Sequence, residues 1–424
     1  MTDSQITTLK NGLRLVTLSL PQVESMTVMV GVGAGSRYET RAISGLSHFW
    51  EHMAFKGTPK RPTSLAISSA IDAVGGEFNA FTDKEFTGYW IRIGARHQEL
   101  AFDILADMLT SSLLKTEEIE REKGVIIEEI NMYEDTPMLQ VSDVFGRLLY
   151  GDNAMGWSTA GEKATVKRIQ RRDFLAYIDR LYFPENMTVV VAGKIDTGEV
   201  KKLAARYFGS LQKHGHKITK PIKITQAAAR LKLAGKKTEQ AHFYLGLPAY
   251  DLGDQRRWAE AMLATILGGN MSSRLFIKIR ERRGLAYYVH CSPEFYTDSG
   301  FLAAAAGVKL AAIEEAIKVT LGEFNDLASK KVADRELVKA KEFNKGRLIL
   351  ATEDSRSVAT RAATQLILEG KIRGIPETLA KIDEVTAAEV QVVAKDIFKP
   401  EKLNLAIIGP YQDQEKFKKL LRLG

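Results

Sequence analysis

Two histidines and a glutamate lie close together in a segment with the pattern of a helix. His48, Glu51 and His52 fall within Ser44–Lys56, and Gly57 is a suitable C-terminal cap. Side chains four residues apart share one face of a helix, so both imidazoles can reach a single metal ion. Imidazole nitrogens suit zinc, and a catalytic zinc site combines three protein ligands with a fourth position for water. The alternative, a polar helix face with two accidental histidines, is disfavoured because the chain has only seven histidines.

A third ligand is needed, and a second helical segment offers carboxylates for that role. Thr116–Tyr133 contains Glu122 and Glu129, which are two helical turns apart and so share a face. The apolar residues between them indicate a buried side, where a carboxylate costs free energy unless it is paired or bound to a metal. Spacing alone does not choose among Glu122, Glu128 and Glu129, and each of them is also compatible with a solvated helix face.

These residue types together predict hydrolysis by an activated water molecule. Two neutral imidazoles and one carboxylate leave a bound zinc ion with a net positive charge, which lowers the pKa of bound water toward ~7 and polarises a carbonyl group. Glu51 can stand next to the metal without binding it, so its carboxylate can take a proton from the water and pass it to a leaving amine. The ligands by themselves do not identify the substrate.

The elements that must position these residues occur twice along the chain. Phe183–Gly193 and Pro400–Gly409 share a turn followed by a buried strand that ends in glycine. Further segments recur in the same order: the strands Met26–Val32 and His242–Leu247, the strands Thr87–Ile93 and Phe301–Val308, and the amphipathic helices His97–Leu113 and Ala311–Leu327. The helix Trp258–Leu267 takes the place of the metal helix in the second half but contains no histidine. Such repetition predicts two domains related by duplication.

We therefore expect two homologous domains of the α+β class. The first, residues 1–210, contains the metal motif and is the predicted catalytic domain. The second, residues 228–424, lacks the motif, and the polar stretch 211–227 is the predicted linker. Strands and helices do not alternate strictly, which favours in each domain a mainly antiparallel sheet covered by helices on one side.

The composition argues against several other classes of protein. The net charge is +8, but basic residues are spread along the chain and mixed with acidic ones, so no nucleic-acid-binding surface is expected. The single cysteine, Cys291, excludes an internal disulfide and a cysteine-based zinc site. The sequence shows neither the apolar region of a signal peptide nor an apolar stretch of about 18 residues. We therefore expect a cytoplasmic protein without a membrane span.

The segment His48-Phe49-Trp50-Glu51-His52 resembles the inverted zinc motif of the pitrilysin clan, the inverzincins. That clan includes insulin-degrading enzyme and the mitochondrial processing peptidases. The chain looks most similar to the short bacterial members that resemble processing peptidases and have two domains per chain. The resemblance covers nearly the whole sequence, from Leu9-Lys10-Asn11-Gly12-Leu13 to the strand that ends at Gly409.

This resemblance assigns roles that spacing leaves open. It implies a zinc metalloendopeptidase with one Zn²⁺ per chain, held by His48, His52 and Glu129. Glu51 is then the catalytic base. Glu122 falls at the position of a carboxylate that orients a ligating histidine through its other ring nitrogen.

A substrate-binding segment also follows from the resemblance. In the clan, the matching segment lies along the cleft at the edge of a sheet, where an extended peptide pairs with it as an added strand. The residues at these positions are Asn79, Ala80, Phe81 and Thr82. Taken alone, this stretch is an ordinary turn before a strand.

Two hydrogen-bond donors are expected from the second half of the chain. The resemblance places them on Arg280 and Tyr287, which can donate to the oxyanion or to a substrate carbonyl. Taken alone, these residues belong to the basic end of a helix that is capped by Gly284.

The implied substrates are peptides or unfolded segments held in a chamber between domains. Larger relatives close such a chamber with four domains, so a homodimer is expected for this chain, and a heterodimer with a metal-free homologue is the alternative. The alternative function is a non-catalytic or partner-dependent subunit of a processing-peptidase-like complex. The intact set of His48, Glu51, His52 and Glu129 argues against it, because a scaffold has no need of a zinc site.

Overall fold

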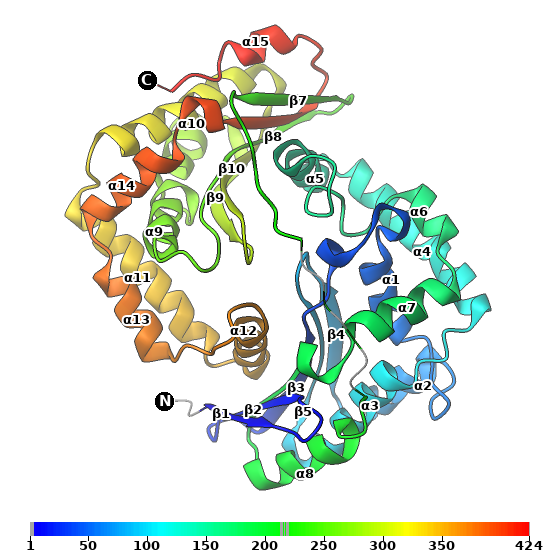
Figure 1. Ribbon diagram of the computed structural model, residues 1–424. Helices are drawn as coiled ribbons and strands as arrows, with labels where there is room; N and C mark the ends of the chain where they lie inside the picture. Colours follow the sequence, from blue (N-terminus) through cyan, green and yellow to red (C-terminus); the bar gives the residue numbers. More distant parts are fainter. Residues whose placement is uncertain (1–3, 213–214, 216, 218–219, 424) are drawn as a thin grey trace. The chain divides into compact units, whose positions relative to one another are not determined.

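The computed structural model describes residues 4–212, 215, 217 and 220–423. The chain divides into two compact units, and each unit combines segments from both halves of the sequence (Figure 1). Unit 1 consists of Met1–Ile130, Trp157–Thr219 and Leu348–Ile375, and unit 2 consists of Asn131–Gly156, Lys220–Arg347 and Pro376–Gly424.

The sequence predicted a first domain of residues 1–210, a linker of residues 211–227 and a second domain of residues 228–424. In the structure, two segments belong to the other unit. Residues 131–156 belong to unit 2, and residues 348–375 belong to unit 1. An amphipathic pattern shows that a helix buries one face but does not show against which sheet, so the sequence could not reveal this exchange. The expected linker falls partly on residues 213–214, 216 and 218–219, which lie outside the described residues.

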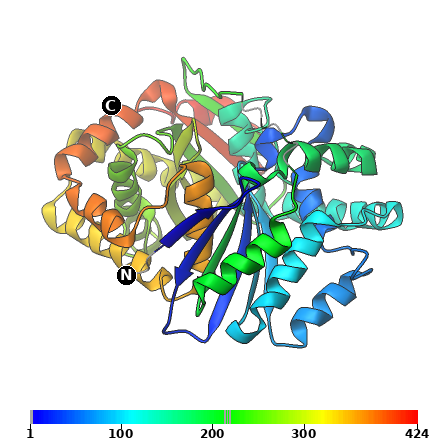
Figure 2. The ribbon, with the colours of Figure 1, turned by 60° about the horizontal axis from the view of Figure 1, so that its bottom comes forward.

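Unit 1 is built on a sheet of six strands among its described residues, in the order β1-β2-β6-β3-β5-β4. The strands are β1 Ser4–Thr8, β2 Arg14–Ser19, β3 Ser25–Val32, β4 Glu77–Thr82, β5 Thr87–Gly94 and β6 Met187–Gly193. Neighbouring strands are antiparallel except for the parallel pair β2 and β6. The strands nearest the N-terminus are blue in Figure 2, and β4 forms one edge of the sheet.

Most helices of unit 1 cover one face of this sheet. They are α1 Leu46–Ala54, α2 Ser64–Asp72, α3 Gln98–Thr110, α4 Thr116–Asp135, α6 Lys163–Arg168, α7 Arg171–Leu181 and α8 Thr197–Phe208. Val28, Val30 and Val191 from the sheet join Phe49 and Phe102 from the helices in one buried cluster. This cluster is the main core of the unit.

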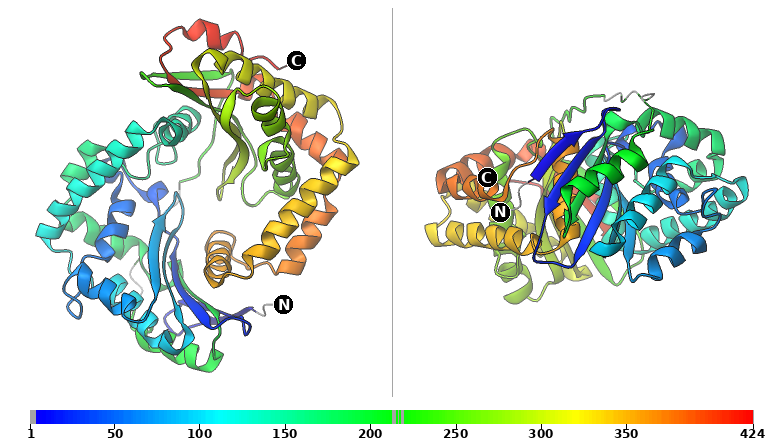
Figure 3. Two further views of the ribbon diagram at one scale, coloured as in Figure 1. Left: turned by 180° about the vertical axis from the view of Figure 1, so that it is seen from behind. Right: turned by 90° about the horizontal axis from the view of Figure 1, so that it is seen from below.

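A single helix from the second half of the chain, α12 (Ser355–Leu368), covers the opposite face of the unit 1 sheet (Figure 3). Apart from Leu366, its buried residues are small, and Ala359 and Ala362 lie in one cluster with Val16 and Met29 of the sheet. Strand β3 is therefore buried on both faces, which explains why Val28, Met29 and Val30 follow one another without polar residues between them.

Unit 2 repeats the same topology with one strand fewer among its described residues. Its order is β7-β11-β8-β10-β9, which corresponds to β2-β6-β3-β5-β4 in unit 1. The strands are β7 Arg230–Gly235, β8 Gln240–Pro248, β9 Ala286–Phe295, β10 Gly300–Lys309 and β11 Asn404–Gly409. The only parallel pair that the described residues form here is β7 and β11, which matches β2 and β6. The expectation of two related α+β domains with mainly antiparallel sheets is confirmed, but the expectation of helices on one side only is wrong for unit 1, because α12 packs on the second face of its sheet.

Most helices of unit 2 come from the second half of the chain. They are α9 Arg257–Gly268, α10 Ile313–Ser329, α11 Asp334–Ala351, α13 Ile375–Glu384, α14 Ala387–Ile397 and α15 Gln414–Lys418. The helix α5, Pro137–Tyr150, comes from the first half and packs on β11 and β8 through Val141, Phe145 and Leu149. Among the described residues, no helix combines the length and the apolar character needed to cross a lipid bilayer.

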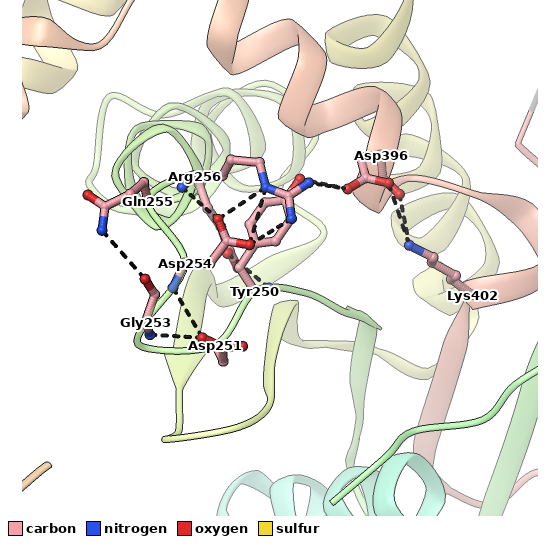
Figure 4. Close-up of polar contacts among 9 residues, drawn as sticks. Tyr250, Asp251, Gly253, Asp254, Gln255, Arg256, Asp396 and Lys402 are labelled. Atoms are coloured by element: carbon pink, nitrogen blue, oxygen red, sulfur yellow. Dashed lines mark hydrogen bonds and ion pairs between the residues drawn. The ribbon is translucent and has the colours of Figure 1, made fainter. Parts of the chain in front are cut away.

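A network of ion pairs fixes the start of α9 to α14 (Figure 4). The guanidinium of Arg256 lies 4.1 Å from the ring centre of Tyr250 and donates hydrogen bonds to Asp254 and Asp396. The Tyr250 hydroxyl donates to the same Asp396 carboxylate at 2.8 Å. The network therefore holds the start of α9, the helix of unit 2 that takes the place of the metal helix.

Helix α9 also contains a fully buried carboxyl group, that of Glu260. One of its oxygens accepts a 3.4 Å hydrogen bond from the backbone nitrogen of Tyr250, and the other has no hydrogen-bond partner among the described residues. Burial raises the pKa of Glu260 to about 8. The carboxyl group is therefore protonated in the folded protein at neutral pH.

We expect Glu260→Gln to stabilise the protein increasingly as the pH rises from 5 to 8. In this window Glu260 is ionised in the unfolded chain but protonated in the fold, so the wild type loses about 1.4 kcal/mol of stability for each pH unit. Glutamine cannot ionise and removes this loss. The measurement is the thermal unfolding midpoint at pH 5 and pH 8, with the exposed Glu239→Gln as the control. A gain that does not grow with pH would contradict the raised pKa.

Candidate metal centre

Helix α1 presents the motif residues because its other side is apolar. Leu46, Phe49, Trp50 and Met53 recur at three- and four-residue spacing and are all buried. The ring of Phe49 meets that of Phe174 on α7 at 4.9 Å between ring centres. These contacts fix the rotation of the helix about its axis, so the motif side faces away from the core.

The start of α1 is held by a carboxylate from outside the helix. Glu39 accepts hydrogen bonds from the backbone nitrogens of Gly45 at 2.8 Å and Ser47 at 2.6 Å. Burial raises the pKa of Glu39 to about 7, although these hydrogen bonds oppose the rise. Gly45 has φ 95°, and a Cβ there would lie 2.7 Å from the carbonyl oxygen of Ala160, so only glycine fits at this position.

Three side chains from α1 and α4 converge on one point. The Nε2 atoms of His48 and His52 are 3.3 Å apart, and each lies 3.6 Å from Oε2 of Glu129. Ligands at about 2.0–2.1 Å from a tetrahedral zinc ion are separated by about 3.3–3.4 Å, so these three atoms have nearly the spacing of three tetrahedral vertices. Within the described part of the chain, this is the only cluster of three or more potential metal-ligating side chains.

His52 is oriented by a buried carboxylate. Its Nδ1 atom lies 2.9 Å from Oε1 of Glu122, and Glu122 is only 4% exposed. A proton on Nδ1 that is donated to this carboxylate leaves the lone pair of Nε2 free for a metal. Burial raises the pKa of Glu122, but the hydrogen bonds from His52 and Lys56 outweigh it, so this pKa lies below its ordinary value.

His48 is held in its neutral form. The pKa of His48 is lowered to about 4, because burial and then the neighbouring His52 lower it more than Glu129 raises it. The neutral imidazole is the form that binds a metal ion. Two imidazoles and one carboxylate are a donor set that zinc accepts.

Glu51 lies beside this cluster but outside it. It is not one of the three converging ligands, and its Oε2 atom is buried without a hydrogen-bond partner among the described residues. Burial raises the pKa of the Glu51 carboxyl group, and the charge of Glu129 adds to this effect. A carboxylate with a raised pKa next to a metal site is well suited to accept a proton from water.

The segment Asn79–Thr82 is itself a strand, and not the turn before one that its sequence suggests when taken alone. It lies in β4, the edge strand whose described partner is β5 alone. The edge is close to the metal helix, because the ring centre of Phe78 on β4 lies 5.6 Å from the ring centre of Phe55, the residue that ends α1. The sheet edge expected from the resemblance is therefore present next to α1.

Arg280 and Tyr287 belong to unit 2, and both sit at irregular points of the backbone. Arg280 lies in a π-helical turn, Phe276–Glu281, and its guanidinium is 5.5 Å from the ring centre of Tyr287. In the pairing of β9 with β10, Tyr288 faces Gly307 and Ala286 faces Val308, so Tyr287 is the extra residue of a bulge and is 76% exposed. Such turns and bulges are frequent at functional sites, but the expected oxyanion role of the pair stays a prediction.

Two residues of this centre were not predicted from the sequence. Lys56 contacts Glu122 at 2.5 Å, and its position four residues after His52 was a usable signal, because such residues share a helix face. Glu39 lies outside the helical pattern, and nothing local in the sequence marks it as the partner of the start of α1.

Comparison with known proteins adds two family matches. Residues 14–163 match the family described as insulinase (peptidase family M16), and residues 168–344 match the peptidase M16 inactive domain. The first match contains the whole metal cluster, and the second contains Arg280 and Tyr287.

Similar proteins cover nearly the full chain. A protein of Streptomyces coelicolor named as an uncharacterized zinc protease is 39% identical over 415 residues, which are 96% of this chain and 90% of that protein. A Bacillus subtilis protein with the same description is 36% identical over 408 residues, 95% of this chain and 97% of that one.

Solved structures share the fold. A protease from Helicobacter pylori superposes with a TM-score of 0.90 at 23% identity and covers 97% of this chain and 100% of its own. A peptidase M16 inactive domain from Pseudomonas fluorescens has a TM-score of 0.88 at 16% identity, with 97% and 99% covered.

We expect Glu129→Gln to abolish tight zinc binding and Glu128→Gln to leave it intact. The carboxylate of Glu129 points at both histidines, whereas its neighbour Glu128 is exposed and outside the cluster. Zinc at about 100 times its dissociation constant stabilises the fold by about 2.7 kcal/mol. The thermal midpoint of the wild type and of Glu128→Gln should therefore fall on chelation, and that of Glu129→Gln should not. If chelation instead left the thermal midpoint of Glu128→Gln unchanged, Glu129 would not be the third ligand.

Proposed function

The chain belongs to the insulinase family, peptidase family M16, and from this premise we propose that it is a zinc-dependent endopeptidase. The observation that carries the proposal is the convergence of Glu129 on both motif histidines, with Glu51 beside them and not among the ligands. Relatives that are named zinc proteases support the same conclusion. The set contains three ligands and a separate carboxylate, which is what metal-assisted amide hydrolysis requires.

In the proposed reaction, Glu51 moves the protons. Zinc bound at this centre supplies a positive charge that acidifies a water molecule and polarises the peptide carbonyl. Oε2 of Glu51 accepts a proton as the water oxygen bonds to the carbonyl carbon. The same carboxyl group then gives this proton to the amine nitrogen as the carbon–nitrogen bond breaks.

The proposed substrate is an extended peptide or an unfolded segment. The support is the position of β4, an edge strand adjacent to α1, whose outer backbone groups can pair with an added strand. Pairing of this kind binds through the backbone, so it tolerates varied side chains. The homodimer and the enclosure of substrate between domains, both implied by the resemblance, stay predictions.

We expect purified protein to cleave a mixed peptide library and Glu51→Gln to lower the rate by about 10²–10⁴-fold while its zinc content stays at one ion per chain. Glutamine keeps the shape of the side chain but cannot accept the proton. Chelation should abolish cleavage by the wild type, and added zinc should restore it. A zinc-loaded wild type that cleaves no peptide would instead favour the non-catalytic or partner-dependent subunit.

We expect Tyr287→Phe to lower kcat by about 10²-fold with unchanged zinc content, because in the role implied by the resemblance the Tyr287 hydroxyl donates a hydrogen bond to the reacting carbonyl. The neighbouring Tyr288→Phe is the matched control, since the hydroxyl of Tyr288 is engaged with Nδ1 of His242 at 3.0 Å. Steady-state kinetics of both variants are compared with the wild type. Equal rates for Tyr287→Phe and wild type would remove Tyr287 from the mechanism.

A further inference from the structure

The turn that ends α1 carries a lysine directed at the same carboxylate that orients His52. The backbone nitrogen of Lys56 bonds to the carbonyl oxygen of Met53 at 3.1 Å, so the residue is anchored to the last turn of the helix. Its ammonium nitrogen lies 2.5 Å from Oε2 of Glu122. Lys56 and His52 are thus held by one side chain of α4.

The two oxygens of Glu122 are divided between these two partners. Oε1 faces Nδ1 of His52 at 2.9 Å, and Oε2 faces the lysine. A carboxylate held at both oxygens cannot rotate about its last bond without losing one contact. The lysine therefore fixes the plane of the carboxylate, and the carboxylate fixes the ring of His52.

Burial distinguishes this ion pair from the many surface pairs of the chain. The side chains of Lys56 and Glu122 are 25% and 5% exposed. The nearby pair of Lys60 and Asp103 has a lysine that is 58% exposed, and Arg61 shares the same aspartate. Removing the lysine from a buried carboxylate leaves an uncompensated charge, which costs far more than the loss of a surface pair.

We propose that Lys56 is a positioning residue of the metal centre, which acts through Glu122 to hold His52 in its ligating orientation. This inference rests on the zinc site of the proposed function but not on the reaction. It can therefore be tested by metal affinity in the absence of any substrate.

The test is the zinc dissociation constant of metal-free full-length protein, measured by competition with a chromophoric chelator. Lys56→Met should weaken zinc binding by about 10-fold, within the 10–100-fold range typical of groups that orient metal ligands. Lys56→Arg should restore most of the affinity, because a guanidinium can also donate to Oε2. Lys60→Met, the same change in an exposed pair, should leave the affinity unchanged.

A double-mutant cycle separates action through Glu122 from a general effect on the fold. Lys56→Met combined with Glu122→Gln should bind zinc no more weakly than Glu122→Gln alone, because the lysine then has no carboxylate to orient. The thermal midpoints of the metal-free variants check the fold, and Lys56→Gln replaces Lys56→Met if the latter does not fold.

Two results would overturn the proposal. One is an affinity of Lys56→Met, or of its glutamine replacement, within about twofold of the wild type, and the other is a pair of losses that simply multiply in the double mutant. If the affinities follow the expectation but the wild type cleaves no peptide, the positioning role stands and the peptidase proposal fails. If the wild type cleaves peptides and Lys56→Met binds zinc normally, only the positioning role fails.

Discussion

The metal centre depends on the contact between α1 and α4, since neither helix holds the site alone. Helix α1 provides both imidazoles, and α4 provides the carboxylate that converges with them and the carboxylate that contacts the other ring nitrogen of His52. Glu129 and Glu122 are two turns apart on α4, so a shift of one turn along either helix would bring the wrong side chain to the histidines. Ile126, between the two glutamates, lies in the same buried core as Phe49 of α1, and this shared core sets the register.

Contacts along its whole length restrain the position of α1 in unit 1. Its apolar face is packed against the sheet and α7, its first turn is capped by Glu39, and its last turn is tied to α4 through Lys56 and Glu122. Three independent restraints act on a helix of nine residues. A metal site tolerates little displacement of its ligands, so a short helix that supplies two of them must be fixed at both ends.

The sequence predicted the parts of this arrangement that are local. The spacing of His48 and His52 and the apolar pattern of their helix are properties of one segment, and the expected strands Met26–Val32 and Thr87–Ile93 agree closely with β3 and β5. Glu129 could not be chosen by spacing, because the choice depends on which face of α4 meets α1. It became predictable only through the resemblance to a known clan.

The parts that the sequence did not predict are long-range contacts. The exchange of α5 and α12 between the sheets, and the capping of α1 by Glu39, join segments whose patterns are complete without each other. The π-helical turn that contains Arg280 and the bulge at Tyr287 were also not predicted, because irregular backbone has no periodic signature. Lys56 is different, since its spacing from His52 was visible and only its partner was unknown.

The two halves of the chain share one strand topology but differ in the side chains of the helix that follows the equivalent strand. The strand orders β2-β6-β3-β5-β4 and β7-β11-β8-β10-β9 correspond, and α1 and α9 follow equivalent strands. At α1, Glu39 from outside the helix accepts two backbone hydrogen bonds, and the side turned away from the core presents His48 and His52 to Glu129. Helix α9 contains no histidine, and its buried Glu260 has a pKa raised to about 8, because only one weak backbone contact opposes the cost of its burial. The fold therefore does not dictate the site. A few side chains on α1 and α4, together with the groups that restrain α1, distinguish the half with the candidate metal cluster from its counterpart.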